Sequence, residues 1–120
     1  MSALPRLGQL LYAVPMAIFG LMHLMMGEMM AGAVPIPGGV LWVYLTGVAL
    51  LLAAGAIITG KQAANAALGL AVFLLLTALM VHLPALMGGD QAAMGQVLKD
   101  IALAGGALIL FGAVRGPDSA

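Results

Sequence analysis

Four apolar stretches, each about 20 residues long, make up most of this chain and limit what it can fold into. The hydrocarbon core of a bilayer is ~30 Å thick and needs about 20 apolar residues per helix, so each stretch is long enough for one membrane span. The stretches lie at about residues 7–26, 40–59, 64–87 and 96–114. The sequence therefore predicts an all-α membrane protein, a four-transmembrane-helix bundle that forms a single membrane domain over residues 1–120.

The composition excludes several other classes of protein. Of the 120 residues, 64% are hydrophobic and 7% are charged, and a soluble domain of this size cannot keep so much apolar surface away from water. The absence of cysteine removes disulfides, thiol redox relays, thiolate-bound zinc and iron–sulfur clusters. A formal net charge of zero, with only four Lys and Arg, excludes nucleic acid as a partner. The lipid bilayer is the partner that this composition requires.

The first apolar stretch has to be compared with a cleaved signal peptide, because the small residues Ala31, Gly32 and Ala33 follow it. It has the length of a membrane span rather than of a short signal-peptide core. It also contains a histidine that a discarded segment would not use. We therefore expect this span to be retained.

Basic residues near the ends of the spans predict the orientation of the bundle. Arg6, Lys61 and Arg115 all fall on one side of a four-span arrangement, and the excess of basic residues in cytoplasmic loops assigns that side to the cytoplasm. Both termini are then expected in the cytoplasm. The loops expected at residues 28–39, which contain Pro35 and Pro37, and at residues 88–95 then face outward.

Ionisable residues recur at one depth near the outer end of the spans. His23 lies about four residues from the end of the first span, His82 about five from the end of the third, and Asp100 about four into the fourth. Each group is costly when it faces lipid and less so when it faces a shared polar cavity, so we expect one ligand pocket that opens toward the outer leaflet. Its candidate residues are His23, His82, Lys99, Asp100, Glu28 at the mouth and Tyr44 nearby.

A second interpretation is that these groups only satisfy one another. Lys99 then extends outward to water, and Asp100 caps a helix end or forms an ion pair. Each histidine donates to a backbone carbonyl freed by a neighbouring proline. Adjacent residues on a helix point about 100° apart, so Lys99 and Asp100 take part together only if one of them reaches along the interface.

Methionines are concentrated near the first histidine. The chain has ten, and five of them lie between residues 22 and 30. Thioethers and imidazoles are ligands that suit Cu(I), whereas methionine also fills irregular gaps among apolar side chains. The leading expectation is that no metal is bound, and the alternative is a copper site made of His23, Met26, Met30 and His82.

Several stretches, taken in their order and spacing, carry a resemblance over about residues 7–114. They are IFGLMHLMMG, the loop AVPIPGG, WVYLTGVALLLAAGAIITGK, VHLPALM and LKDIALAGGALIL. In this order they resemble the DoxX family of small four-span bacterial membrane proteins. The resemblance implies a four-helix bundle of the bacterial inner membrane that is associated with redox or detoxification systems, with relatives that are subunits of quinone-reducing sulfur oxidoreductases. His23, Lys99 and Asp100 stand at family-like positions.

Three functional hypotheses follow. The leading one is a subunit or accessory protein of a quinone-linked membrane oxidoreductase or detoxification system, with a quinone as the bound group. The second is a non-enzymatic structural or assembly subunit of a membrane complex, and the third is a copper-handling membrane protein. Whether the chain is itself an enzyme stays open in all three. The expected partners are the lipid bilayer, subunits of a membrane oxidoreductase and further copies of the chain.

Overall fold

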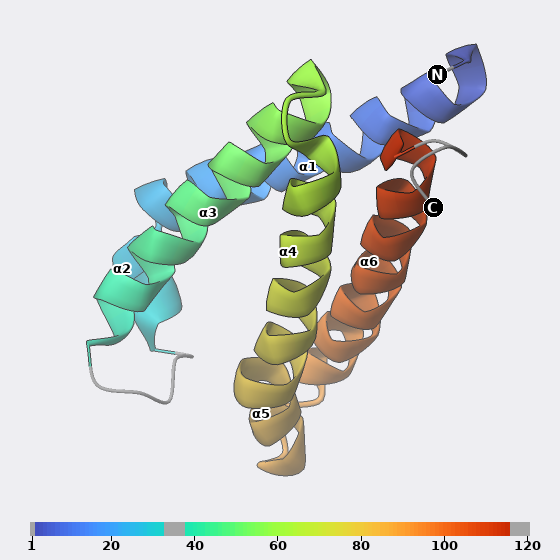
Figure 1. Ribbon diagram of the computed structural model, residues 1–120. Coiled ribbons are helices and arrows are strands. Elements are labelled where there is room, and N and C mark those ends of the chain that lie inside the picture. Colours follow the sequence, from blue (N-terminus) through green and yellow to red (C-terminus); the bar gives the residue numbers. More distant parts are fainter. Residues whose placement is uncertain (1, 33–37, 116–120) are drawn as a thin grey trace.

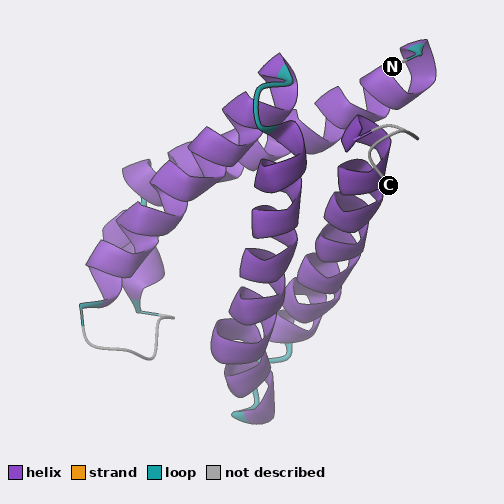
Figure 2. Ribbon diagram, viewed as in Figure 1, coloured by secondary structure: helices purple, strands orange, loops and turns teal. Residues whose placement is uncertain are grey.

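The computed structural model describes residues 2–32 and 38–115, which form helices joined by short turns and contain no strand (Figure 2). The elements are α1 (Ala3–Met25), α2 (Gly27–Ala31), α3 (Gly39–Thr59), α4 (Ala63–Thr77), η1 (Ala78–His82), α5 (Leu83–Met87) and α6 (Ala92–Arg115). α4, the π-helical turn η1 and α5 follow one another without a break. Four helical segments are thus long and apolar enough to cross a membrane, namely Ala3–Met25, Gly39–Thr59, Ala63–Met87 and Ala92–Arg115. The predicted all-α four-helix membrane bundle is confirmed, and the chain is a multi-pass membrane protein.

Some helix ends differ from the sequence-based expectation for local reasons. α6 begins at Ala92 rather than near residue 96, because the Asp90 side chain accepts a hydrogen bond of 3.1 Å from the Ala92 N–H and satisfies a donor in the first turn. The short helix α2 occupies the first part of the segment expected to be a loop. Pro35 and Pro37 of that loop lie outside the described residues.

The helices pack as two pairs, α1 with α3 and α4 with α6, which diverge toward the end of the molecule opposite the termini (Figure 1). The hydrophobic core lies toward the termini, because its residues come from the middle of α1, from α4 up to Leu74, and from the second halves of α3 and α6. They are Ala13, Met16, Leu50, Ala54, Ile57, Ala67, Leu70, Ala71, Leu74, Ala104, Ala107 and Leu110. We refer to the half opposite the termini, where the pairs separate, as the diverging half.

Two glycines bring α1 and α3 close together. A Cβ added at Gly20 would lie 2.8 Å from the carbonyl oxygen of Gly47, and one added at Gly47 would lie 2.8 Å from that of Gly20. Real Cβ atoms do not approach backbone oxygens so closely, so only glycine allows this crossing. Small residues serve the same purpose at helix contacts in membranes generally.

Polar side chains of α1 connect it to both neighbouring helices near the termini. The Gln9 amide donates to the Ile57 carbonyl at 2.6 Å, and the Arg6 guanidinium donates to the carbonyl of the following residue at 2.9 Å. These carbonyls belong to the last turn of α3 and have no donor within that helix. The Tyr12 hydroxyl donates to the Leu103 carbonyl of α6 at 2.6 Å. The sequence analysis did not single out Gln9, which is buried and lies three residues before Tyr12.

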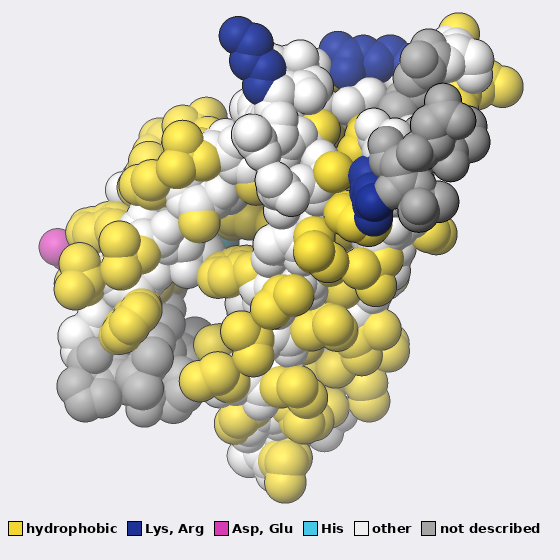
Figure 3. All heavy atoms as spheres, viewed as in Figure 1, with side chains coloured by type: hydrophobic (Ala, Val, Ile, Leu, Met, Phe, Trp, Pro, Cys, Tyr) yellow, Lys and Arg dark blue, Asp and Glu magenta, His cyan; other side chains and the backbone are white. Residues whose placement is uncertain are grey.

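Both termini and the turn between α3 and α4 lie at one end of the molecule, and Lys and Arg side chains gather there (Figure 3). Arg6 lies in the first turns of α1, Lys61 in the turn, and Arg115 at the end of α6. The basic residues used to predict orientation therefore share one end of the bundle.

Candidate functional site

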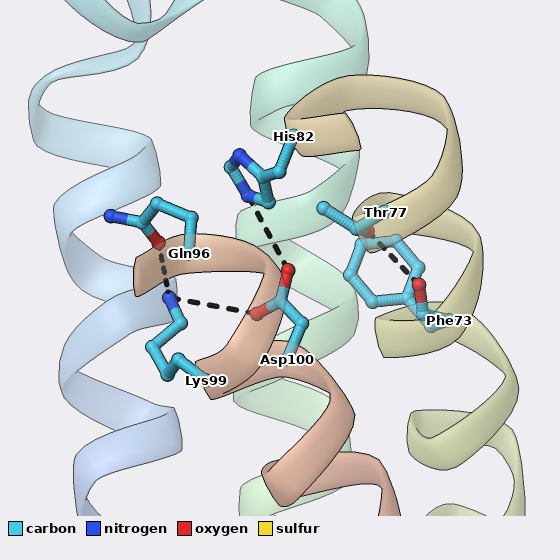
Figure 4. Close-up of polar contacts among 6 residues, drawn as sticks. All are labelled: Phe73, Thr77, His82, Gln96, Lys99 and Asp100. Carbon is cyan, nitrogen blue, oxygen red and sulfur yellow. Dashed lines mark hydrogen bonds and ion pairs between the residues drawn. The ribbon is translucent and has the colours of Figure 1, made fainter. Parts of the chain in front are cut away.

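An ionisable pair lies in the diverging half, between the π-helical turn and α6 (Figure 4). His82 Nε2 is 3.4 Å from Asp100 Oδ2. The His82 side chain is 22% exposed, whereas the Asp100 side chain is only 3% exposed. A carboxylate this deeply buried within a membrane span is expensive, and such residues commonly serve a function.

The π-helical turn η1 accounts for the position of His82 in this pair. Pro84 has no N–H to donate to the carbonyl four residues before it, so regular α-helical bonding is interrupted here. The Leu83 N–H donates instead to the carbonyl of Ala78, five residues back. Such a turn contains one extra residue, which rotates the side chains that follow relative to those before it. The His82 ring consequently meets α6.

Lys99 reaches along α6 to join the pair. Its Nζ lies 3.6 Å from Asp100 Oδ1 and 2.8 Å from the side-chain oxygen of Gln96, which accepts its hydrogen bond. The ammonium also lies 5.0 Å from the centre of the Phe19 ring on α1, a cation–π contact between the two helix pairs. With a side chain that is 41% exposed, Lys99 keeps its charge at the edge of the site. Lys99 and Asp100 therefore both belong to this site, although they are adjacent on one helix.

Asp100 Oδ2 has no hydrogen-bond donor among the described residues. Leaving a buried polar atom without a partner costs about 1–3 kcal/mol, more when the group is charged. The imidazole of His82 lies 3.4 Å from this oxygen, but its geometry does not form a hydrogen bond. The site therefore has an acceptor oxygen ready for a hydroxyl or N–H, with the cation of Lys99 on the other carboxylate oxygen.

His23 and His82 have different partners. Its Nδ1 donates to the Phe19 carbonyl at 2.6 Å, within α1, in the tautomer that carries the proton there. A Cβ added at Gly47 would lie 3.0 Å from the Cβ of His23, so this side chain packs against α3. The structure brings His82, Lys99 and Asp100 together and holds His23 at the contact between α1 and α3.

Glu28 and Tyr44 lie at a second place, a shallow hollow of about 460 Å³ beside the break between α1 and α2, with Tyr44 contributed by α3. Its lining residues are Met25, Met26, Gly27, Glu28, Met29 and Tyr44, so His82 and Asp100 do not line it. The Tyr44 ring lies directly over Gly27 and leaves no room for a Cβ there.

The four residues of the alternative copper site are divided among these places. Met26 lines the hollow, His23 bonds within α1 and His82 pairs with Asp100, while Met30 does not line the hollow. Among residues 2–32 and 38–115 there is no group of three or more His, Cys, Asp or Glu side chains that could hold a metal ion.

The site includes two residues that were not expected from the sequence, Gln96 and Phe19. Gln96 was detectable, since it stands three residues before Lys99 on the same helix and such neighbours face each other. Phe19 was not, because its contact with Lys99 depends on how α1 crosses α6.

Comparisons with models of protein families, with curated proteins and with solved structures give no match for this chain. The chemistry of the site is therefore the basis for assigning a function.

Proposed function

We propose that this protein is a subunit or accessory protein of a quinone-linked oxidoreductase or detoxification system in the bacterial inner membrane, as its resemblance to DoxX proteins implies. In this proposal His82, Lys99 and Asp100 bind the headgroup of a quinone or quinol. The observation that carries it is the buried Oδ2 atom of Asp100, which has no donor among the described residues.

The three side chains offer what a quinone headgroup requires. A quinol hydroxyl can donate to Asp100 Oδ2, and a quinone carbonyl can accept from the Lys99 ammonium or the His82 imidazole. Such bonds to charged groups contribute about 1.5–3 kcal/mol each. The exposed fraction of Lys99 supports an approach from lipid between α1 and α6, where a hydrophobic quinone resides.

The proposed orientation has both termini in the cytoplasm. It is supported by Arg6, Lys61 and Arg115, which share the end of the bundle that carries the termini. Asp90 and Glu28 belong to segments of the diverging half and carry negative charge there. The quinone would then bind in the outer leaflet.

The binding of a short-chain ubiquinol, kept reduced under anaerobic conditions, to the purified protein in lipid nanodiscs tests the proposal, because its hydroxyl groups can donate to Asp100 Oδ2. We expect saturable binding by calorimetry and native quinone in organic extracts of the detergent-purified protein. Asp100→Asn should weaken binding at least about tenfold, the equivalent of one charged hydrogen bond. Asp90→Asn is the matched control, since it makes the same chemical change in an exposed turn and should leave binding unchanged.

The same measurements decide against the proposal if wild-type protein neither binds the ubiquinol nor carries native quinone after purification. The assembly hypothesis would then be the better account. It gains direct support if Asp100→Asn reduces recovery of a larger membrane complex while Asp90→Asn does not.

A further inference from the structure

Three methionine residues line one hollow at the point where the first membrane helix ends. α1 ends at Met25, and Met26 leaves the helical conformation with φ −119° and ψ 26° before α2 begins at Gly27. Met25, Met26 and Met29 all line the hollow of about 460 Å³ described above, which we call the methionine hollow. The break between the two helices thus places three methionine residues around one hollow.

Filling of a core does not explain these side chains. Met25 is 81% exposed and Met29 is 78% exposed, so neither occupies an internal gap. Glu28 lines the same hollow and adds an acidic residue to its lining. This combination offers soft ligands together with one compensating negative charge.

We infer that the methionine hollow binds a soft monovalent cation, Cu(I) in the cell, through the sulfur atoms of Met25, Met26 and Met29. Thioethers select Cu(I) over harder ions such as Zn²⁺, which prefer nitrogen, oxygen or thiolate ligands. Glu28 attracts the cation and offsets its charge. No histidine takes part, and the site is separate from that of His82, Lys99 and Asp100, so the inference does not depend on the proposed quinone function.

Competition for Cu(I) with a chromogenic chelator under anaerobic, reducing conditions tests the inference on the whole purified chain. We expect one Cu(I) per chain, equivalent binding of Ag(I) by calorimetry, and no displacement by Zn²⁺. Combining Met25→Leu, Met26→Leu and Met29→Leu removes the sulfur atoms and nearly conserves volume, and should lower the affinity by more than about tenfold. The matched control combines Met80→Leu, Met87→Leu and Met94→Leu, three exposed methionines elsewhere, and should bind as the wild type does.

Equal binding by the two triple variants, or equal loss in both, would overturn the inference. A second measurement avoids reliance on the folding of the variants. Ag(I) added to wild-type protein with ¹³C-labelled methionine methyl groups should shift the signals of Met25, Met26 and Met29 and leave those of Met80, Met87 and Met94 in place. Shifts in the second set alone, or in neither, would also exclude the site.

Discussion

His82 Nε2 lies 3.4 Å from Asp100 Oδ2, yet that oxygen accepts no hydrogen bond from the described part of the chain. A pair that existed only to stabilise the fold would be aligned, because a buried carboxylate recovers the cost of its burial through well-formed hydrogen bonds. The other oxygen, Oδ1, has a cation beside it, since the Lys99 ammonium is 3.6 Å away. One carboxylate oxygen thus has a cation beside it and the other is open to a ligand.

Asp100→Asn should therefore leave the protein as stable as the wild type or raise its unfolding free energy by about 1 kcal/mol, while it weakens ligand binding. The change removes the burial of a charge. It also loses the ion pair with the partly exposed Lys99, which is worth about 0–1 kcal/mol, and alters the contact with His82, which is not an aligned hydrogen bond. Thermal unfolding in one detergent provides the measurement. Asp90→Asn should change little, since asparagine also accepts a hydrogen bond at a helix start. A large loss of stability in Asp100→Asn alone would identify Asp100 as a structural residue instead.

Gln9→Leu should lower the unfolding free energy by about 1–3 kcal/mol. The Gln9 amide is buried and donates to the Ile57 carbonyl at 2.6 Å, so leucine would leave that carbonyl in the last turn of α3 without its donor. Denaturation by SDS in mixed micelles measures the loss. Gln91→Leu, in an exposed turn, is the control and should stay close to the wild type. Similar values for both variants would mean that water or lipid headgroups replace the Gln9 bond.

Gly47→Ala should destabilise the protein by about 1–3 kcal/mol, because the added methyl group would meet the Gly20 carbonyl oxygen at 2.8 Å and force α1 away from α3. Gly55→Ala lies on the same helix, and its Cβ would enter open space. That change should be neutral or stabilise by up to about 1 kcal/mol, as expected for alanine in place of helical glycine. Thermal unfolding of the two variants side by side tests the contrast, and equal melting temperatures would contradict the close crossing.

The orientation prediction can be tested with single cysteines, because the chain has none of its own. On intact spheroplasts a membrane-impermeant maleimide should label Gln91→Cys, in the turn between α5 and α6. It should label Lys61→Cys, between α3 and α4, only after permeabilisation. The opposite pattern would place the termini outside.

The fold class could be predicted because the length and apolar character of the four stretches leave no alternative to membrane helices. The start of α6 and the helix α2 could not be placed, since they depend on local interactions. For α6 this is the hydrogen bond from the Ala92 N–H to Asp90.

For the candidate site, the depth of each residue along its helix could be predicted better than the direction in which its side chain points. Depth follows from counting residues at about 1.5 Å per residue, whereas direction depends on which neighbour each helix face meets. Gly20 marks the face of α1 that crosses α3, and His23 follows it by three residues on that same face. The sequence therefore contained a signal for the position of His23. The sequence contained no such signal for the direction of the His82 side chain, because the π-helical turn adds a rotation that spacing alone does not reveal.

The buried apolar residues of this bundle are concentrated toward the termini. Its two halves should therefore differ in how easily they open locally. Local opening costs least where the fewest buried contacts are lost, so backbone amides around His82 and Asp100 should exchange with solvent earlier than those around Ala54 or Ala107. Thermal motion that spreads the two helix pairs would widen the path to Asp100 and leave their joined ends intact. Under the proposed function, anchoring and ligand recognition would thereby be divided between opposite ends of the same four helices.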